Sequence, residues 1–228
     1  MIDNKPVIAI VLARGGSKRL PGKNIKQFGD KPLIVWTLQA AQNAKTIDRV
    51  ILSSDDQDIM DTFRKAGGEV PFRRPDALAS DDASSADAVL HALEELNIET
   101  GYLVLLQPTS PLRNAQDIDN CVTMCVEKAA PLCESVTALG FPASWLFSQN
   151  PDGYLQKIGL ADDKPLLRPN GAVYVADVAW FKKHQAFWSE GQTAAYEIPF
   201  ARSIDIDTES DFQIAQAFLH SHLFNECV

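Results

Sequence analysis

The chain has 228 residues, 46% of them hydrophobic, and its formal net charge is −9. This length suffices for one sizeable core, so we expect a single domain over residues 1–228, with an insertion, rather than two full domains. The acidic balance disfavours broad attraction to nucleic acid or to an anionic membrane, and we expect neither as a partner.

Strand-like and helix-like segments alternate over the first two thirds of the chain. Continuous apolar runs predict strands at 7–12, 49–53, 102–106 and 134–139. Amphipathic or capped segments predict helices at 32–44, 57–66, 84–96 and 115–128. Such a βα repeat is typical of an α/β fold with a mostly parallel central sheet and helices on both faces.

The pattern changes at residues 141–167. Aromatic side chains and the turn signal at 150–153 predict a small hairpin-like arm outside the sheet. Exposed aromatics are typical of protein interfaces, so the arm is either a dimerisation element or a flap packed on its own domain. The main domain then resumes with a strand at 172–176, a short helix, a strand at 195–199, an extended segment at 203–207 and a helix at 209–219.

The N-terminal residues show no basic region ahead of an apolar one, and Arg14 interrupts the first apolar run. We therefore expect no signal peptide and no membrane span, and hence a soluble cytoplasmic protein. The chain has four cysteines, Cys121, Cys125, Cys133 and Cys227. They show no C-x-x-C spacing, which favours buried free thiols over metal ligands.

The opening segment 7–24 reads VIAIVLARGGSKRLPGKN. Two adjacent glycines allow unusual backbone conformations and a close approach of N–H groups to anionic oxygens, while basic side chains neutralise charge. Counting excludes a Walker loop, which would need glycine at Ser17 and Ser or Thr at Asn24. The third glycine of a dinucleotide fingerprint is also missing. The loop therefore predicts a triphosphate site, with a solvated basic loop as the alternative.

The segment Ile204-Asp205-Ile206-Asp207 places two carboxylates at i and i+2. In an extended segment both aspartates lie on one face and both isoleucines face the core. Mg²⁺ takes one or two such carboxylates together with phosphate oxygens and water. The alternative is that Asp207 caps the following helix, with Thr208 as another candidate cap, and that Asp205 faces solvent.

Three further polar segments are candidates for ligand contacts, each with a structural alternative. Residues 73–85 contain two arginines and the run ASDDASS, which could read a base edge or only begin the helix at 84–96. Residues 107–113 begin with Gln107 and form a proline-stiffened loop or a simple turn. Residues 168–171 combine Arg168, Asn170 and a glycine turn.

Five blocks in register together resemble the CMP-sialic acid synthetase family, the acylneuraminate cytidylyltransferases. They are ARGGSKRLPGKN (13–24), RPDALASDDASS (74–85), LQPTSPLR (106–113), RPNGAVYV (168–175) and SIDIDTESD (203–211). The resemblance implies a Rossmann-like nucleotidyltransferase, usually a homodimer. It also implies an enzyme that couples CTP to a nine-carbon 2-keto sugar acid and releases pyrophosphate with Mg²⁺.

The resemblance also implies roles for individual residues. Arg14, Ser17, Lys23 and Asn24 would hold the CTP phosphates, and Lys23, Asp207 and Arg14 form the expected catalytic set. Cytosine and its ribose would be surrounded by Arg74, Ala83 and Ser85. The sugar acid would contact Gln107, Arg168, Asn170 and Tyr174, while Asp205 and Asp207 would bind Mg²⁺. One of these two aspartates would accept the hydroxyl proton of the sugar.

One departure concerns the sugar. Sialate-using members of the family have a further arginine before the RPNG block, whereas residues 160–167 hold only Lys164. A lysine supplies charge but no bidentate fork. The expected substrate is therefore N-acetylneuraminate or a related acid, with legionaminic, pseudaminic and eight-carbon Kdo as alternatives. A nucleotide-binding regulator without catalysis is the alternative of another class, against which the paired carboxylates argue.

Overall fold

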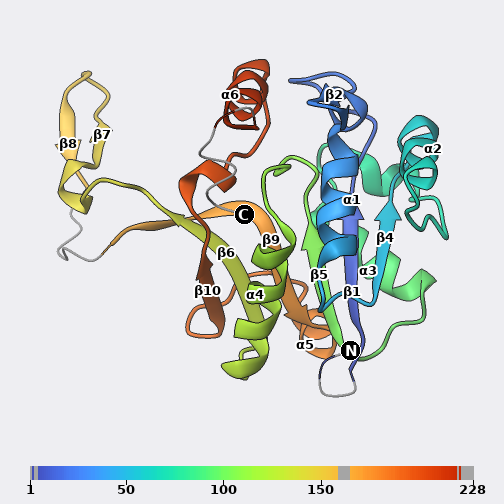
Figure 1. Cartoon of the computed structure of the whole chain (residues 1–228). Helices are drawn as coiled ribbons and strands as arrows, with labels where there is room; N and C mark the ends of the chain where they lie inside the picture. Colours follow the sequence, from blue (N-terminus) through green and yellow to red (C-terminus); the bar gives the residue numbers. More distant parts are fainter. Residues whose placement is uncertain (1, 3–4, 159–164, 220, 222–228) are drawn as a thin grey trace.

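A six-stranded sheet forms the centre of the computed structural model, which describes residues 2, 5–158, 165–219 and 221. The strand order is β10-β6-β9-β5-β1-β4 (Figure 1). The strands are β1 Val7–Leu12, β4 Arg49–Ser53, β5 Tyr102–Leu106, β6 Leu132–Ala138, β9 Leu167–Asp177 and β10 Thr193–Glu197. β1 pairs in parallel with β4 and β5, and β10 with β6, so the prediction of a mostly parallel sheet is confirmed.

Strand β9 is antiparallel to both of its neighbours, β5 and β6. It is longer than the predicted strand at 172–176. Because it runs in the opposite direction, its first residues lie at the carboxyl ends of the neighbouring strands. Asn170 and Gly171 lie within β9 and not in the predicted turn, and they are thereby brought to the end of the sheet where Gln107 follows β5. In open α/β sheets, ligands bind beyond the carboxyl ends of the strands, which is where these residues lie.

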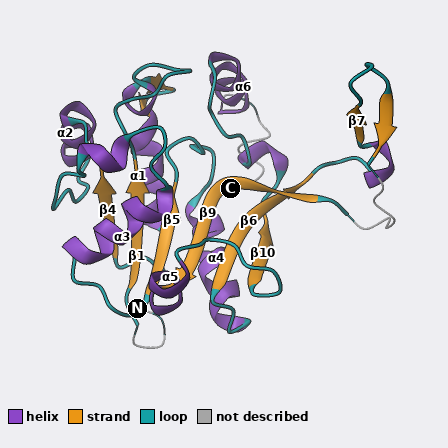
Figure 2. Ribbon diagram, turned by 180° about the vertical axis from the view of Figure 1, so that it is seen from behind, coloured by secondary structure: helices purple, strands orange, loops and turns teal. Residues whose placement is uncertain are grey.

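Helices cover both faces of the sheet, as predicted (Figures 1 and 2). One face carries α1 Leu33–Asn43, α2 Gln57–Lys65 and α4 Ala115–Glu127, and the other carries α3 Ser85–Glu95 and α5 Val178–His184. The bounds of α1 to α4 agree with the predicted helices to within one residue at each end, and α5 is the short helix predicted after the strand at 172–176. Asn114 caps α4 through a capping box with Asp117, because each side chain accepts a hydrogen bond from the other residue's backbone N–H.

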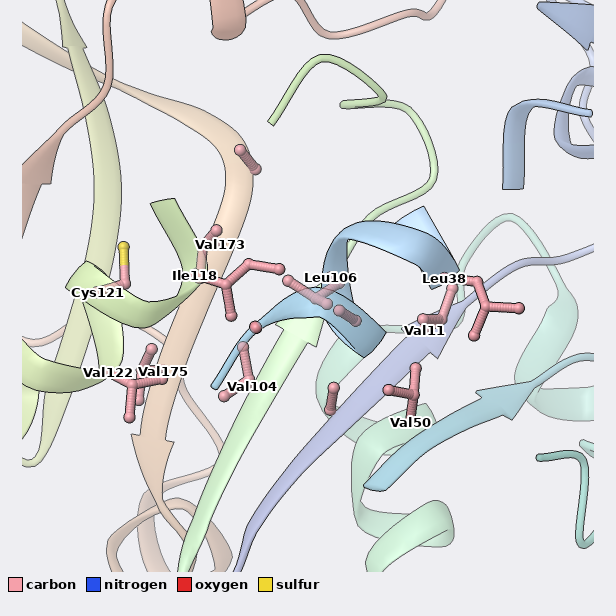
Figure 3. Packing of buried hydrophobic residues seen from close by; sticks show 14 of the residues in the cluster. Val11, Leu38, Val50, Val104, Leu106, Ile118, Cys121, Val122, Val173 and Val175 are labelled. Carbon is pink, nitrogen blue, oxygen red and sulfur yellow. The ribbon is translucent and has the colours of Figure 1, made fainter. Parts of the chain in front are cut away.

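The core on the α1 and α4 side combines apolar side chains of the central strands with those of the covering helices (Figure 3). Val11, Val104 and Leu106 pack there against Leu38 of α1 and Ile118 of α4. All five side chains are fully buried, and each such burial stabilises the fold by about 1.5–3 kcal/mol relative to an exposed side chain.

A third apolar cluster joins a segment near the start of the chain to a segment near its end. Leu20 and Phe28 from the N-terminal part pack with Ile204, Ile206 and Phe212 from the C-terminal part. The short strand β2 Gln27–Phe28, which pairs with β3 Lys31–Pro32, and the helix α6 Glu209–Leu219 carry residues of this cluster beyond the upper end of the sheet in Figure 1. Residues 203–207 form no strand, yet both isoleucines are buried, as the i, i+2 pattern predicts.

The predicted arm is an antiparallel hairpin of β7 Phe147–Gln149 and β8 Leu155–Lys157. It projects from the extended ends of β6 and β9, away from the rest of the molecule (Figures 1 and 2). Trp145, Tyr154 and Leu155 expose 69%, 72% and 71% of their surface. The alternative of a flap packed on its own domain is therefore wrong for this hairpin. Its role in dimerisation stays a prediction, and Lys164 lies outside the described residues.

Candidate active site

A cavity of about 550 Å³ opens between the loop after β1, the segment before α3 and the loop after β5. Most of the predicted site residues line it: Arg14, Ser17, Lys23, Asn24, Arg74, Ala83, Ser85, Gln107 and Asp207. The predicted residues Arg168, Asn170, Tyr174 and Asp205 do not line this cavity. The expected CTP set is thus gathered in one place, and the expected sugar set only in part.

The structure corrects the expected role of the two adjacent glycines in the loop after β1, which was to supply unusual backbone conformations. Gly15 and Gly16 do not have a positive φ, whereas Gly22 does, with φ of +66°. Gly15 is needed for space instead, since a Cβ there would lie 2.5 Å from Asp56 Oδ2. The Gly15 N–H donates to Asp55 Oδ1 at 3.1 Å, so the turn after β4 braces the loop.

Lys23 and Asp207 meet at the edge of the cavity. Lys23 Nζ lies 3.1 Å from Asp207 Oδ1 and donates to the Ile206 carbonyl at 2.7 Å. Arg19 Nη2 lies 2.8 Å from the other carboxylate oxygen of Asp207. Only 12% of the Lys23 side chain is exposed, so its ammonium group has a fixed position beside the cavity.

Thr208, not Asp207, caps the helix that follows. The Thr208 hydroxyl accepts from the Asp211 N–H at 3.3 Å, and Asp211 Oδ2 accepts from the N–H groups of Asp207 and Thr208. This arrangement leaves the Asp207 carboxylate free of the helix and directed at the basic loop. The capping alternative for Asp207 is therefore wrong.

Asp205 is the more enclosed of the two aspartates. Burial raises the pKa of its carboxyl and nearby Asp207 raises it further, while a hydrogen bond from Thr109 and the charge of Lys23 lower it. Its Oδ1 atom is buried and accepts no hydrogen bond within the described residues. An unsatisfied buried carboxylate oxygen fits a hard cation, which Mg²⁺ is. The described residues contain no group of three or more His, Cys, Asp or Glu side chains placed to hold a metal, so phosphate oxygens and water would complete such a site.

Arg74 and Asn24 support the cavity through hydrogen bonds to the protein itself. Arg74 is 4% exposed and donates to the side-chain and carbonyl oxygens of Ser53, at the end of β4. Burial lowers the pKa of its guanidinium to about 10, and Asp55 opposes that shift. Asn24 Nδ2 donates to the Arg14 carbonyl at 3.0 Å and thereby closes the loop on itself.

Of the residues expected to contact the sugar acid, Gln107 lines the cavity, whereas Asn170 supports the backbone beside it. A Cβ on Gly171, whose φ is +75°, would lie 3.3 Å from Gln107 Oε1. Asn170 is 2% exposed and uses both ends of its amide, since Oδ1 accepts from Ser135 Oγ and Nδ2 donates to Ser203 Oγ. It therefore fixes the part of β9 next to Gln107 instead of presenting a free amide.

Arg168 and Tyr174 lie on either side of Asn170 along β9, Arg168 near the start of the strand and Tyr174 beyond its middle. The Arg168 guanidinium donates only to the adjacent Pro169 carbonyl, at 3.4 Å, among the described residues. Tyr174 packs against Phe187, and burial raises the pKa of its hydroxyl to about 12, with Glu134 and Asp205 adding to the shift. Glu134 faces Tyr174 across the β6–β9 pairing and is 7% exposed.

Sequence reasoning assigned no role in the site to Asp81, which it considered only as part of the cap of the following helix, or to Arg113. Asp81 pairs with two cations of the loop after β1, and Arg113 donates to the carbonyls of Gln107 and Ser110. Burial lowers the pKa of Arg113 to about 9, with Asp117 opposing the shift. Both residues lie inside the motif blocks quoted above. Their sequence position therefore pointed to the site, but their partners could be seen only in three dimensions.

Two expectations about the rest of the chain can be compared with the described residues. Cys121, Cys125 and Cys133 are buried and form no disulfide, as predicted, while Cys227 lies outside the described residues. Within the described part of the chain, no helix combines the length and the apolar character needed to cross a bilayer.

Known proteins resemble the chain over nearly its whole length. The family model of cytidylyltransferases matches residues 8–218. CMP-N,N'-diacetyllegionaminic acid synthase of Legionella pneumophila is 30% identical over 223 residues, which cover 93% of this chain and 96% of that protein. N-acylneuraminate cytidylyltransferase of Escherichia coli O18:K1:H7 is 32% identical over 92% of this chain, and this chain spans 51% of that protein.

A solved structure supports the fold. CMP:2-keto-3-deoxy-manno-octonic acid synthetase complexed with CTP superposes with a TM-score of 0.72 at 17% identity, covering 94% of this chain and 98% of that chain. The predicted Rossmann-like α/β fold of a nucleotidyltransferase is thus confirmed. The chain belongs to the cytidylyltransferase family, is a nucleotidyltransferase enzyme, and has the predicted likeness to CMP-sialic acid synthetases.

Proposed function

We propose that this enzyme couples CTP to a nine-carbon 2-keto sugar acid and releases pyrophosphate. The observation that carries the proposal is the meeting of Lys23 and Asp207, 3.1 Å apart, at a cavity lined by the residues expected for CTP. A cation fixed beside a carboxylate at a polyphosphate-sized cavity suits phosphoryl transfer, which depends mainly on positioning and electrostatics.

The reaction is an in-line displacement at the α-phosphorus of CTP. The anomeric hydroxyl oxygen of the sugar acid forms the new bond to phosphorus, and the bond from phosphorus to the oxygen that bridges the α- and β-phosphates breaks. Pyrophosphate leaves with the electron pair of that bond, and the hydroxyl proton passes to Asp205 or Asp207. Lys23 Nζ offsets the negative charge that develops on the α-phosphate.

Mg²⁺ is the proposed cofactor, and Asp205 and Asp207 are the residues that would hold it. When bound, it would neutralise phosphate charge and polarise the phosphoryl group. Both Asp207 oxygens are paired with Lys23 and Arg19 in this structure. Binding of CTP and the metal therefore involves an exchange of partners, in which phosphate oxygens receive the two cations and the carboxylate is released.

We propose the nonulosonic acids as the substrate class, including N-acetylneuraminate, legionaminic acid and pseudaminic acid. Gln107 lines the cavity and would contact the sugar acid, and β9, which carries Arg168, Asn170 and Tyr174, would supply the rest of the sugar pocket. The decisive test is a panel of these acids and Kdo, each incubated with CTP and Mg²⁺ and assayed for pyrophosphate. We expect release only with a nine-carbon acid, and release with Kdo alone would contradict the proposal.

The same panel separates catalysis from regulation. A nucleotide-binding regulator would bind CTP without releasing pyrophosphate for any acid, and that outcome would overturn the enzymatic proposal for this site. We also propose that the β7–β8 hairpin forms a homodimer interface, because its apolar side chains are exposed.

A further inference from the structure

Asp81 bridges two cations of the loop after β1. Its Oδ1 atom lies 2.9 Å from Arg14 Nη2, and its Oδ2 atom pairs with Lys18 Nζ. Arg14 also donates to the Ser80 carbonyl at 2.8 Å, so the loop is tied to the segment before α3. A hydrogen bond and the charge of Lys18, helped by Arg14, lower the pKa of Asp81, which keeps its carboxylate ionised.

The four basic side chains of the loop are shared between two carboxylates. Arg14 and Lys18 pair with Asp81, whereas Arg19 and Lys23 pair with Asp207. A polyphosphate that enters the cavity must therefore displace these carboxylates in order to pair with the basic side chains. Asp207 already has an assigned role, but Asp81 makes no hydrogen bond other than those to Arg14 and Lys18 within the described residues.

The Asp81 contacts are accessible to water and can be exchanged. The exposed fraction of the side chain is 44% for Asp81 and 78% for Lys18. Exposed ion pairs are individually weak, so a ligand of higher charge can displace them. Without a counter-anion, the unpaired cations would retain pyrophosphate, and slow product release would limit turnover.

We propose that Asp81 is the internal counter-anion of the triphosphate site. It holds Arg14 and Lys18 when the site is empty, yields them to the β- and γ-phosphates of CTP, and takes them back as pyrophosphate leaves. The role rests on the proposed function, because pyrophosphate is the product of that reaction.

The test is equilibrium binding to Asp81→Asn, measured by calorimetry with inorganic pyrophosphate, CTP and CMP at low ionic strength. The substitution keeps the side-chain shape and removes the competing charge. We expect pyrophosphate and CTP to bind about three to ten times more tightly than to the wild type. CMP lacks the β- and γ-phosphates, so its affinity should stay the same.

The chain provides a matched control in Asp82→Asn. Asp82 is the exposed neighbour, the net charge changes equally, and no ion pair of Asp82 occurs within the described residues. Its binding constants should equal those of the wild type. Adding Lys18→Gln to Asp81→Asn should remove part of the gain for pyrophosphate, because one of the released cations is then missing.

The outcomes separate this role from simple structural support. Equal or weaker pyrophosphate binding by Asp81→Asn overturns the counter-anion role, as does a parallel change for CMP, which would indicate a brace for the segment before α3. If the wild type binds neither CTP nor pyrophosphate, the proposed function fails as well. Tight CTP binding by the wild type without a gain in Asp81→Asn rejects only the role of Asp81.

Discussion

Lys23 and Asp207 are 184 positions apart in the chain, yet Lys23 Nζ lies 3.1 Å from Asp207 Oδ1. The contact exists because Leu20 and Phe28 pack with Ile204 and Ile206 in one apolar cluster, which holds the two polar segments side by side. Burial of the isoleucines thus directs the aspartates toward the basic loop. Hydrophobic packing positions the charged groups of the proposed active site.

Asp207→Ala should abolish most turnover and leave CTP binding measurable. The substitution removes a carboxylate that faces the cavity, while Arg14, Ser17 and Lys23 would still be in place to hold the phosphates. We expect a loss in kcat of about 100-fold or more. Pyrophosphate release measures kcat, and calorimetry measures CTP affinity.

Glu209→Ala is the control for that variant. Glu209 is also acidic and lies two residues further on, but it pairs with Lys26 at 2.9 Å, outside the set that lines the cavity. Its turnover should remain near the wild-type value. Unchanged turnover in Asp207→Ala would remove Asp207 from the proposed mechanism.

Asp117→Ala should strongly destabilise the fold, because it breaks a buried ion pair. Asp117 accepts from Arg202 Nε and Nη2, both at 2.9 Å, and the two side chains are almost fully buried. Removing one partner leaves the other charge buried without compensation, at a cost of about 3–5 kcal/mol in the free energy of unfolding. Urea denaturation measures this change.

The control for Asp117 is an exposed ion pair of the same kind. Asp61 and Arg64 are 3.0 Å apart on the surface of α2. Asp61→Ala should change the free energy of unfolding by less than about 1 kcal/mol. Similar effects of the two substitutions would show that the Asp117–Arg202 pair contributes no more than a surface contact.

The strands and the basic loop after β1 could be predicted from the sequence because they follow local rules. The apolar run of β1, the cluster of basic residues after it and the alternation of Ile204, Asp205, Ile206 and Asp207 all depend on neighbours within a few positions. Each of these features has the predicted place in the structure. The roles of the individual side chains toward CTP, sugar and metal remain predictions.

The partners of side chains could not be predicted in the same way. Asn170 was expected to contact the sugar, but its amide bonds to Ser135 and Ser203, which are distant in the sequence. The antiparallel direction of β9 escaped prediction as well, since an apolar strand does not encode the direction of its neighbours. Both features depend on tertiary arrangement.

Glu134 makes stability depend on pH. Burial raises the pKa of its carboxyl from 4.5 to about 7, so the folded state binds the proton more tightly than the unfolded chain. Proton binding by Glu134 therefore stabilises the folded state fully below the ordinary pKa of 4.5, and this stabilisation is lost as the pH rises through the folded-state pKa of about 7. Glu134→Gln should therefore be more stable than the wild type by about 3 kcal/mol at about pH 8, and similar to it below about pH 4.

Urea denaturation at the two pH values measures this difference. Glu94→Gln, at an exposed position of α3, is the matched control and should show the wild-type pH dependence. If Glu134→Gln shifts stability equally at both pH values, the effect comes from packing and not from the proton.

The hairpin arm provides the last prediction, which concerns the oligomeric state. Leu155 of β8 exposes 71% of its surface, and a homodimer would bury it, so Leu155→Asp should place an uncompensated charge in the interface and give a monomer. Gln156→Asp introduces the same charge on the opposite face of the same strand and should leave the dimer intact. Light scattering at micromolar protein concentration distinguishes the two states. A monomeric wild type, or equal dissociation of both variants, would contradict an interface built on the apolar face of β8.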